Sequence, residues 1–109
     1  MFQKVADISV FGLTGDLDIL EARQLLRSLG RLIHRDWVKI VLDFERVEHI
    51  NYQAMAELVR IVVASHILNG QIKLANVSSY HRNILRVAGL EEFFETYETV
   101  GDAILSFDD

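Results

Sequence analysis

Residues 38–44 constrain the fold more than any other part of this chain. They read Val-Lys-Ile-Val-Leu-Asp-Phe, so five of the seven are apolar and three are β-branched. A run this short and this apolar is typical of a central strand that is covered on both faces. Such strands occur in sheets whose parallel neighbours are joined by helices. The stretch therefore predicts an α/β fold.

The segments on both sides of this strand have the patterns of long helices. Asp18, with Glu21 three residues later, predicts a helix start of the capping-box type, and this helix is expected to end near Asp36. Asn51 is the expected N-cap of a second helix, which Gly70 ends. The expected inward face of the second helix consists of Ala54, Leu58, Ile61, Val62 and Ser65.

Weaker patterns at the two ends complete the expected sheet. Residues 2–5 and 7–10 are expected to form strands, the second ending near Gly12 ahead of a turn at Gly15 and Asp16. Because no helix separates these two strands, antiparallel pairing is expected only here. Residues 45–50 are expected to be a loop.

Two further strands are expected at residues 72–77 and 93–97. Ser78 or Ser79 is expected to cap a third helix that stops at Gly89, and Thr99 to cap a fourth. The sequence therefore predicts a single α/β domain over residues 1–109, with a mixed, mostly parallel sheet of four to five strands covered by about four helices.

The composition excludes several classes of function. The 109 residues suffice for one small domain, and none of them is Cys, which excludes disulfides, thiolate metal sites and cysteine nucleophiles. A formal net charge of −5 would be repelled by nucleic acid, which is therefore not an expected partner. With no signal-peptide pattern and no apolar stretch near the ~20 residues of a membrane span, we expect a cytoplasmic protein without direct membrane insertion.

Charge is unevenly distributed along the chain. The first helix carries a basic stripe at four-residue spacing, and acidic residues gather between residues 91 and 98 and at residues 108–109. The stripe consists of Arg23, Arg27, Arg31 and Arg35. We interpret it as a solvated helix face, with a docking surface as the alternative.

The motifs that mark catalytic and metal sites are absent. The sequence has no G-x-S-x-G, no P-loop and no H-E-x-x-H motif, and its four histidines lack ligand-like spacing. We therefore expect a protein that is not an enzyme and needs no cofactor or metal. A possible ligand edge is formed by Asp43, Asn76 and Ser78, although a lone carboxylate such as Asp43 is more often a loop-stabilising hydrogen-bond acceptor.

Several short sequence motifs, in their order along the chain, resemble those of the STAS domain family, the fold of anti-sigma-factor antagonists. Residues 15–18 (Gly-Asp-Leu-Asp) are similar to its early G-E-L-D turn. Residues 40–50 resemble its central strand and loop, and residues 72–78 its fourth strand and third helix start. Residues 87–94 resemble its T-G-L-x-x-x-F ending. The resemblance spans nearly the whole chain.

The resemblance implies partner switching controlled by phosphorylation. In the antagonist members a serine at the start of the second helix, in a D-S-S-G motif, is phosphorylated by a kinase that doubles as an anti-sigma factor. Here the motif reads Asn51-Tyr52-Gln53-Ala54, so Gln53 holds the phosphoacceptor position and the motif is degenerate. The free N–H groups and positive dipole end of this helix start favour an anion.

We therefore expect a non-catalytic signalling module of transcription regulation, whose partner is an anti-sigma factor or serine-kinase-like protein. The expected partner-binding residues are Asp16, Asn51, Tyr52, Gln53 and the exposed Met55 and Arg60. One alternative is a small accessory subunit of a lipid or anion transporter that binds its ATPase. Another is nucleotide binding near Asp43 and Asn76. The sequence leaves the oligomeric state open.

Overall fold

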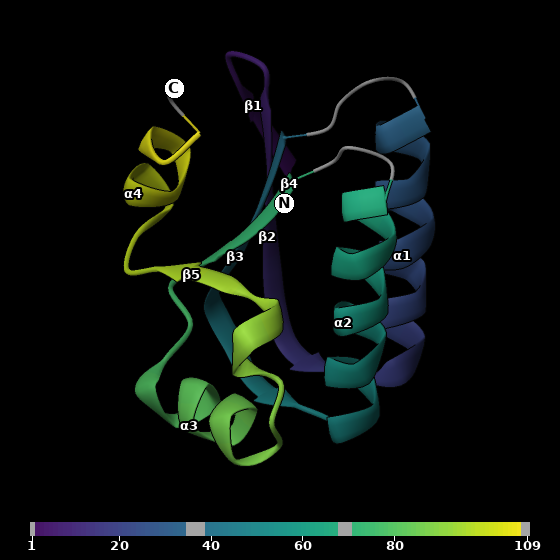
Figure 1. Ribbon diagram of the computed structural model, residues 1–109, viewed down its shortest axis with the longest axis vertical. Coiled ribbons are helices and arrows are strands. Elements are labelled where there is room, and N and C mark those ends of the chain that lie inside the picture. Colours follow the sequence, from purple (N-terminus) through teal and green to yellow (C-terminus); the bar gives the residue numbers. More distant parts are fainter. Residues whose placement is uncertain (1, 35–38, 68–70, 108–109) are drawn as a thin grey trace.

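A five-stranded sheet in the order β1-β2-β3-β4-β5 lies at the centre of the fold (Figure 1). The computed structural model describes residues 2–34, 39–67 and 71–107. The strands are β1 (Phe2–Val5), β2 (Ile8–Leu17), β3 (Lys39–Ile50), β4 (Gln71–Ala75) and β5 (Glu95–Tyr97). β1 is antiparallel to β2, whereas the other neighbouring pairs are parallel. The predicted mixed, mostly parallel sheet is confirmed.

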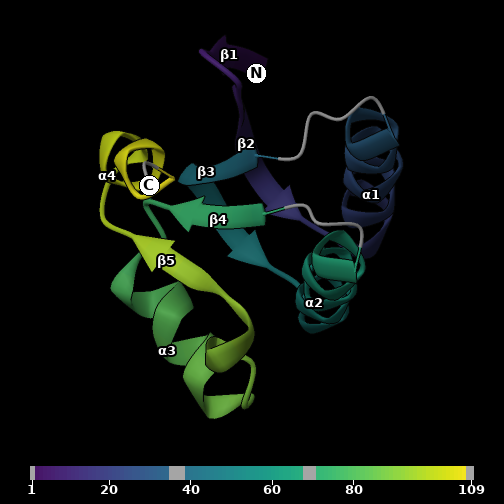
Figure 2. The same ribbon diagram turned by 45° about the horizontal axis from the view of Figure 1, so that its top comes forward.

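Helices cover both faces of this sheet, which confirms the predicted α/β class. The helices are α1 (Ile19–His34), α2 (Tyr52–Ile67), α3 (Ser79–Val87) and α4 (Val100–Leu105), with a 3-10 turn η1 (Glu91–Phe93). α1 and α2 lie side by side on one face, α4 lies on the other, and α3 lies at one end (Figures 1 and 2). Within the described ranges, no helix is both long and apolar enough to cross a bilayer.

β3 is buried on both faces, as its apolar run predicts. Ile40 and Leu42 point into the core under α1 and α2, and Val41 points the other way, into a smaller core with Ala103 of α4 and Phe107 just beyond it. Ile40, Val41 and Leu42 have no solvent-exposed surface. Removing such side chains from water is the main contribution to the stability of a domain of this size.

The predicted helix starts are also confirmed. Each predicted N-cap side chain accepts a hydrogen bond from a backbone N–H in the first turn of its helix. The bonds run from Glu21 to Asp18 (2.9 Å), from Gln53 to Asn51 (2.7 Å), from His81 to Ser78 (3.1 Å) and from Asp102 to Thr99 (3.0 Å). The four caps locate helix starts correctly because the bonds that define them are local in sequence.

The predicted ends of the first two long strands are wrong. β2 does not stop near Gly12 but continues to Leu17, and residues 45–50 are not a loop but the second half of β3. The two extensions pair with each other, with register shifts on either side of Gly15. Gly15 has a φ of +71°, which a glycine adopts as readily in a β-bulge as in a turn. The Gly-Asp pair therefore marks an irregularity within a strand.

Smaller differences occur in the C-terminal half. β4 ends at Ala75 because Asn76 leaves the strand with a φ of +58°. The strand predicted at residues 93–97 is shorter, beginning at Glu95 after the 3-10 turn. Predictions that involve residues 35–38, 68–70 and 108–109, including Arg35, Asp36 and Gly70, lie outside the described residues.

Candidate partner-binding surface

The starts of α1 and α2 lie together at one edge of the sheet. β2 leads into α1 and β3 leads into α2, and the backbone N–H of Asn51 donates to the carbonyl oxygen of Leu17 at 3.0 Å. In the paired strands just before this point, Asp16 lies opposite His49. Parallel neighbouring strands therefore bring Asp16 to the same edge as the first turn of α2.

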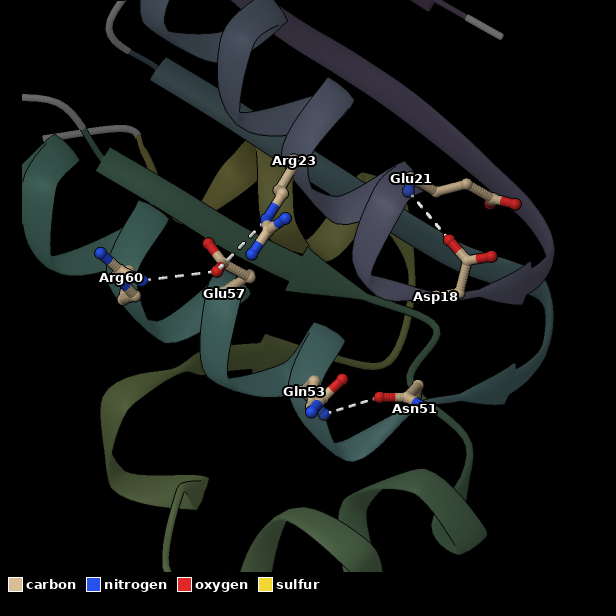
Figure 3. A network of polar contacts seen from close by, with 7 residues as sticks. All are labelled: Asp18, Glu21, Arg23, Asn51, Gln53, Glu57 and Arg60. Carbon is tan, nitrogen blue, oxygen red and sulfur yellow. Dashed lines mark hydrogen bonds and ion pairs between the residues drawn. The ribbon is translucent and has the colours of Figure 1, made fainter.

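The predicted residues at this edge are open to solvent. Asp16, Asn51 and Gln53 are exposed, and Tyr52 is 63% exposed. The Asn51 side-chain oxygen caps α2 through the Gln53 backbone, which leaves the Gln53 side chain outside the cap (Figure 3). Leu20, in the first turn of α1, is a further exposed apolar residue here that the sequence analysis missed. Leu20 lies outside the i, i+3, i+4 spacing of the buried apolar residues of α1, and this spacing could have identified it as exposed.

Met55 does not belong to this surface, so its predicted place among the exposed residues of α2 is wrong. Its side chain has no exposed surface and packs in the main core. α2 contacts both α1 and the sheet, so it buries a broad arc that includes Ala54, Met55 and Leu58. The predicted inward stripe did not include Met55 and Glu57, which α2 also buries.

Arg60 is exposed as predicted, and it forms an ion pair that the sequence analysis did not identify. Its Nη1 lies 3.4 Å from Oε1 of Glu57, and Nε of Arg23 on α1 lies 3.9 Å from the same oxygen (Figure 3). Glu57 is largely buried between the two helices. The i, i+3 spacing of Glu57 and Arg60 was a visible signal, whereas the contact with Arg23 depends on how the helices pack.

Three exposed side chains beside the surface could share a cation. Asp16, Glu48 and His49 each place one ligand atom so that these atoms all lie within 4.8 Å of one another. The sequence analysis did not group them, because the β2–β3 pairing brings Asp16 beside the other two. Exposed acidic groups are often close together without binding an ion, so the arrangement does not by itself assign a metal site.

The predicted ligand edge has a different geometry from the one expected. Asp43 lies within β3, level with the end of β4, and not at the end of its own strand. Its Oδ1 accepts hydrogen bonds from the Glu45 backbone and from Nδ2 of Asn76, both at 3.0 Å. Ser78 caps α3. The three residues thus hold the β4–α3 connection in place, beside an open depression of about 370 Å³.

A family model of the STAS domain matches residues 1–103. The chain belongs to the STAS domain family. A search of curated protein sequences finds no match to this STAS domain.

Several solved structures are similar to this STAS domain. A Thermotoga maritima protein, provisionally assigned as an anti-sigma factor antagonist, has a TM-score of 0.86 and 19% identity, with 97% of this chain and 92% of that chain covered. SpoIIAA of Bacillus in the phosphorylated form has a TM-score of 0.74 and 20% identity, covering 98% and 97%. A sulfate transporter family protein of Wolinella succinogenes has a TM-score of 0.79 and 17% identity, covering 94% and 85%. At such identities the likeness shows the shared fold.

Proposed function

We propose that this STAS domain is a non-catalytic regulatory module of the cytoplasm that binds a protein partner through the start of α2. The observation that carries this proposal is the exposed first turn of α2, where Tyr52 and Gln53 project beside Asp16 from a helix start that Asn51 caps. An exposed tyrosine on a rigid helix is a common anchor in protein interfaces. The proposed partner is an anti-sigma factor or a serine-kinase-like protein, as in partner switching.

Phosphorylation at position 53 does not control this binding in our proposal. The Gln53 side chain ends in a neutral amide, which has no hydroxyl group to accept a phosphoryl group. The domain therefore stays competent to bind when a kinase is active. This separates it from antagonists that a phosphoserine releases.

The described side chains support a role without catalysis. Acyl or phosphoryl transfer needs a nucleophile within hydrogen-bond reach of a base. Among the hydrogen bonds of the described residues, none joins a serine or threonine hydroxyl to a histidine ring or to a carboxylate. The hydroxyl groups of Ser78 and Thr99 accept helix-capping bonds instead.

The test is capture of partners from the native cell with the tagged protein, followed by affinity measurement on the purified partner. We expect Tyr52→Ala and Arg60→Glu each to weaken the complex by about tenfold or more, as for residues at the centre of an interface. Tyr80→Ala on α3 is the matched control, because Tyr80 is 66% exposed and Tyr52 is 63% exposed. Unchanged affinity in both test variants would show that the partner binds elsewhere.

A Gln53→Ser variant tests the proposed loss of the switch. We expect phosphate to appear at position 53 of this variant in the native cell, and not on the wild-type protein. The surrounding recognition surface would then have survived the loss of its acceptor. Absence of phosphate from the variant would contradict a partner of the serine-kinase class.

A second candidate function is that of an accessory subunit on a membrane transporter. The observation that favours it is the similarity in fold to a sulfate transporter family protein. In that case the captured partner would be the transporter or its ATPase, and the Gln53→Ser variant would remain unphosphorylated. Recovery of a kinase or phosphatase instead would exclude this candidate.

A further inference from the structure

The outer face of α1 and α2 carries two parallel rows of exposed side chains. The α1 row consists of Arg23, Arg27 and Arg31, and the α2 row consists of Arg60, Val63 and Ile67. Side chains three or four residues apart lie on the same face of a helix, so each row is a continuous stripe. Val63 is 44% exposed and Ile67 is 76% exposed. We call these six residues the arginine face.

Glu57 shows that Arg23 and Arg60, one from each row, lie on the same side of the molecule. Its carboxylate contacts Arg23 of one row and Arg60 of the other (Figure 3). Because both helices start at the same edge and rise about 1.5 Å per residue, Arg27 and Arg31 lie roughly 6 and 12 Å beyond Arg23. Val63 lies roughly 9 Å beyond Glu57 by the same rise, level with these two arginines.

The arginine face is basic in a protein that is acidic overall. α1 and α2 together contain four arginines and two glutamates, although the formal net charge of the chain is −5. Glu57 is shared between Arg23 and Arg60. In the part of the chain that the structure describes, Arg27 and Arg31 have no carboxylate partner. Among the described residues, this half of the face therefore has positive charge without an ion pair, and exposed aliphatic surface at the same level of α2.

We propose that the arginine face binds an acidic segment of a partner protein. The guanidinium groups recur about every 6 Å along α1, the spacing at which carboxylates one turn apart recur on a helix. Arginine pairs with carboxylates in a bidentate geometry, and an aliphatic side chain of the segment would cover Val63 and Ile67. This surface goes beyond the proposed contact at the start of α2, because Arg27, Arg31 and Ile67 lie at the other end of the helices.

The charge pattern favours a protein segment over an anionic membrane. Membrane recruitment by charge typically needs about four to eight clustered Lys or Arg residues. The arginine face has four, of which two already share Glu57. Arginine beside aliphatic surface is instead the composition of protein interfaces.

The experiment uses a fluorescent synthetic helical peptide with glutamate at every fourth position and leucines between, titrated with the full chain at low salt. We expect saturable binding that the double variant Arg27→Glu, Arg31→Glu weakens about tenfold or more, since like charges then face each other. Arg82→Glu with Arg86→Glu is the matched control, because these arginines are also exposed and four residues apart but lie on α3. We expect this control to change the affinity by less than about twofold, since α3 lies away from the face.

Three further measurements test whether the arginine face recognises both the carboxylates and the aliphatic side chains of the bound peptide. Ile67→Ser should weaken peptide binding by about threefold or more, as expected for lost apolar contact. A peptide with glutamine in place of glutamate should not bind. Backbone amide shifts on addition of the acidic peptide should change along residues 27–31 and 63–67, which the proposed function does not use, and not at Tyr52 and Gln53.

Four outcomes would overturn the proposal. They are no binding of the acidic peptide, equal binding of the glutamine peptide, no effect of the Arg27 and Arg31 charge reversal, and preferential binding to vesicles that contain phosphatidylglycerol. Tyr52→Ala should not change binding of the acidic peptide, because Tyr52 lies at the first turn of α2 and Val63 and Ile67 lie toward its other end. Circular dichroism of each variant confirms that the comparison is between folded proteins.

Discussion

Nε2 of His81 on α3 lies 3.0 Å from the backbone carbonyl oxygen of Glu48. A side chain from α3 therefore bonds to β3 in the part of that strand that has no β4 partner. β4 pairs with β3 only as far as Asp43, and β3 runs on to Ile50. Because a carbonyl oxygen can only accept, Nε2 is the donor. His81 is 2% exposed, and its Nδ1 has no partner within the described residues. The imidazole therefore has a structural role at this position.

We expect His81→Ala to lower the free energy of unfolding by about 2–4 kcal/mol. The substitution leaves a cavity and removes the hydrogen bond to Glu48. Urea denaturation measures the effect, with exposed Arg82→Ala as the neighbouring control, expected to stay within about 0.5 kcal/mol. A His81→Ala protein as stable as the control would show that the contact with Glu48 contributes nothing.

Lys73 of β4 is expected to hold α4 on the sheet. Its buried Nζ donates to the carbonyl oxygen of Ser106 at 3.2 Å and to the hydroxyl oxygen at 2.7 Å, and lies 4.3 Å from the ring centroid of Phe107. Hydrogen bonds to a charged group contribute about 1.5–3 kcal/mol, so Lys73→Met should speed amide exchange in α4 by about tenfold or more. Hydrogen-exchange mass spectrometry would show this as a change in α4 that exceeds the change in β3. Equal protection of α4 in both proteins would refute it.

Truncation of Met55 should cost much more stability than truncation of Arg60. Met55→Ala removes a fully buried side chain and should cost about 2–5 kcal/mol of stability. Arg60→Ala truncates an exposed side chain and leaves Arg23 beside the largely buried Glu57 carboxylate, so it should cost no more than about 1 kcal/mol. Thermal unfolding of the two variants measures the difference. If Arg60→Ala lost more stability than Met55→Ala, the Arg60–Glu57 ion pair would contribute more than an exposed arginine is expected to.

Asp7 is expected to titrate below its ordinary range. The hydrogen bond from the Lys39 side chain, at an N–O distance of 3.2 Å, is the main cause that lowers the pKa of Asp7 from 3.8. A lowered carboxyl pKa stabilises the fold above the unfolded pKa, and this contribution is lost as the pH falls through the folded pKa. NMR titration should show the pKa of Asp7 returning toward 3.8 in Lys39→Met. No change between the two proteins would remove Lys39 as the cause.

The candidate surface could be located from the sequence only in part. Asn51 was identifiable because an N-cap bonds to a backbone group two residues away, and its neighbours Tyr52 and Gln53 follow from it. The burial of Met55 could not be identified, because it depends on α1 and the sheet both packing against α2. The ion pair between Arg23 and Glu57 could not be identified either, because the two residues belong to different helices.

The α/β class, the central strand that is buried on both faces, and the four helix starts could all be predicted from the sequence. Each of these depends on side-chain periodicity or on hydrogen bonds within a few residues, which the order of residues displays directly. Three features came only from the folded structure: β2 and β3 continue past Gly12 and Phe44, His81 bonds to the carbonyl oxygen of Glu48 in that extension, and Arg23 and Arg60 share Glu57. These features depend on hydrogen bonds and packing between segments distant in the chain, whose alignment no local pattern specifies.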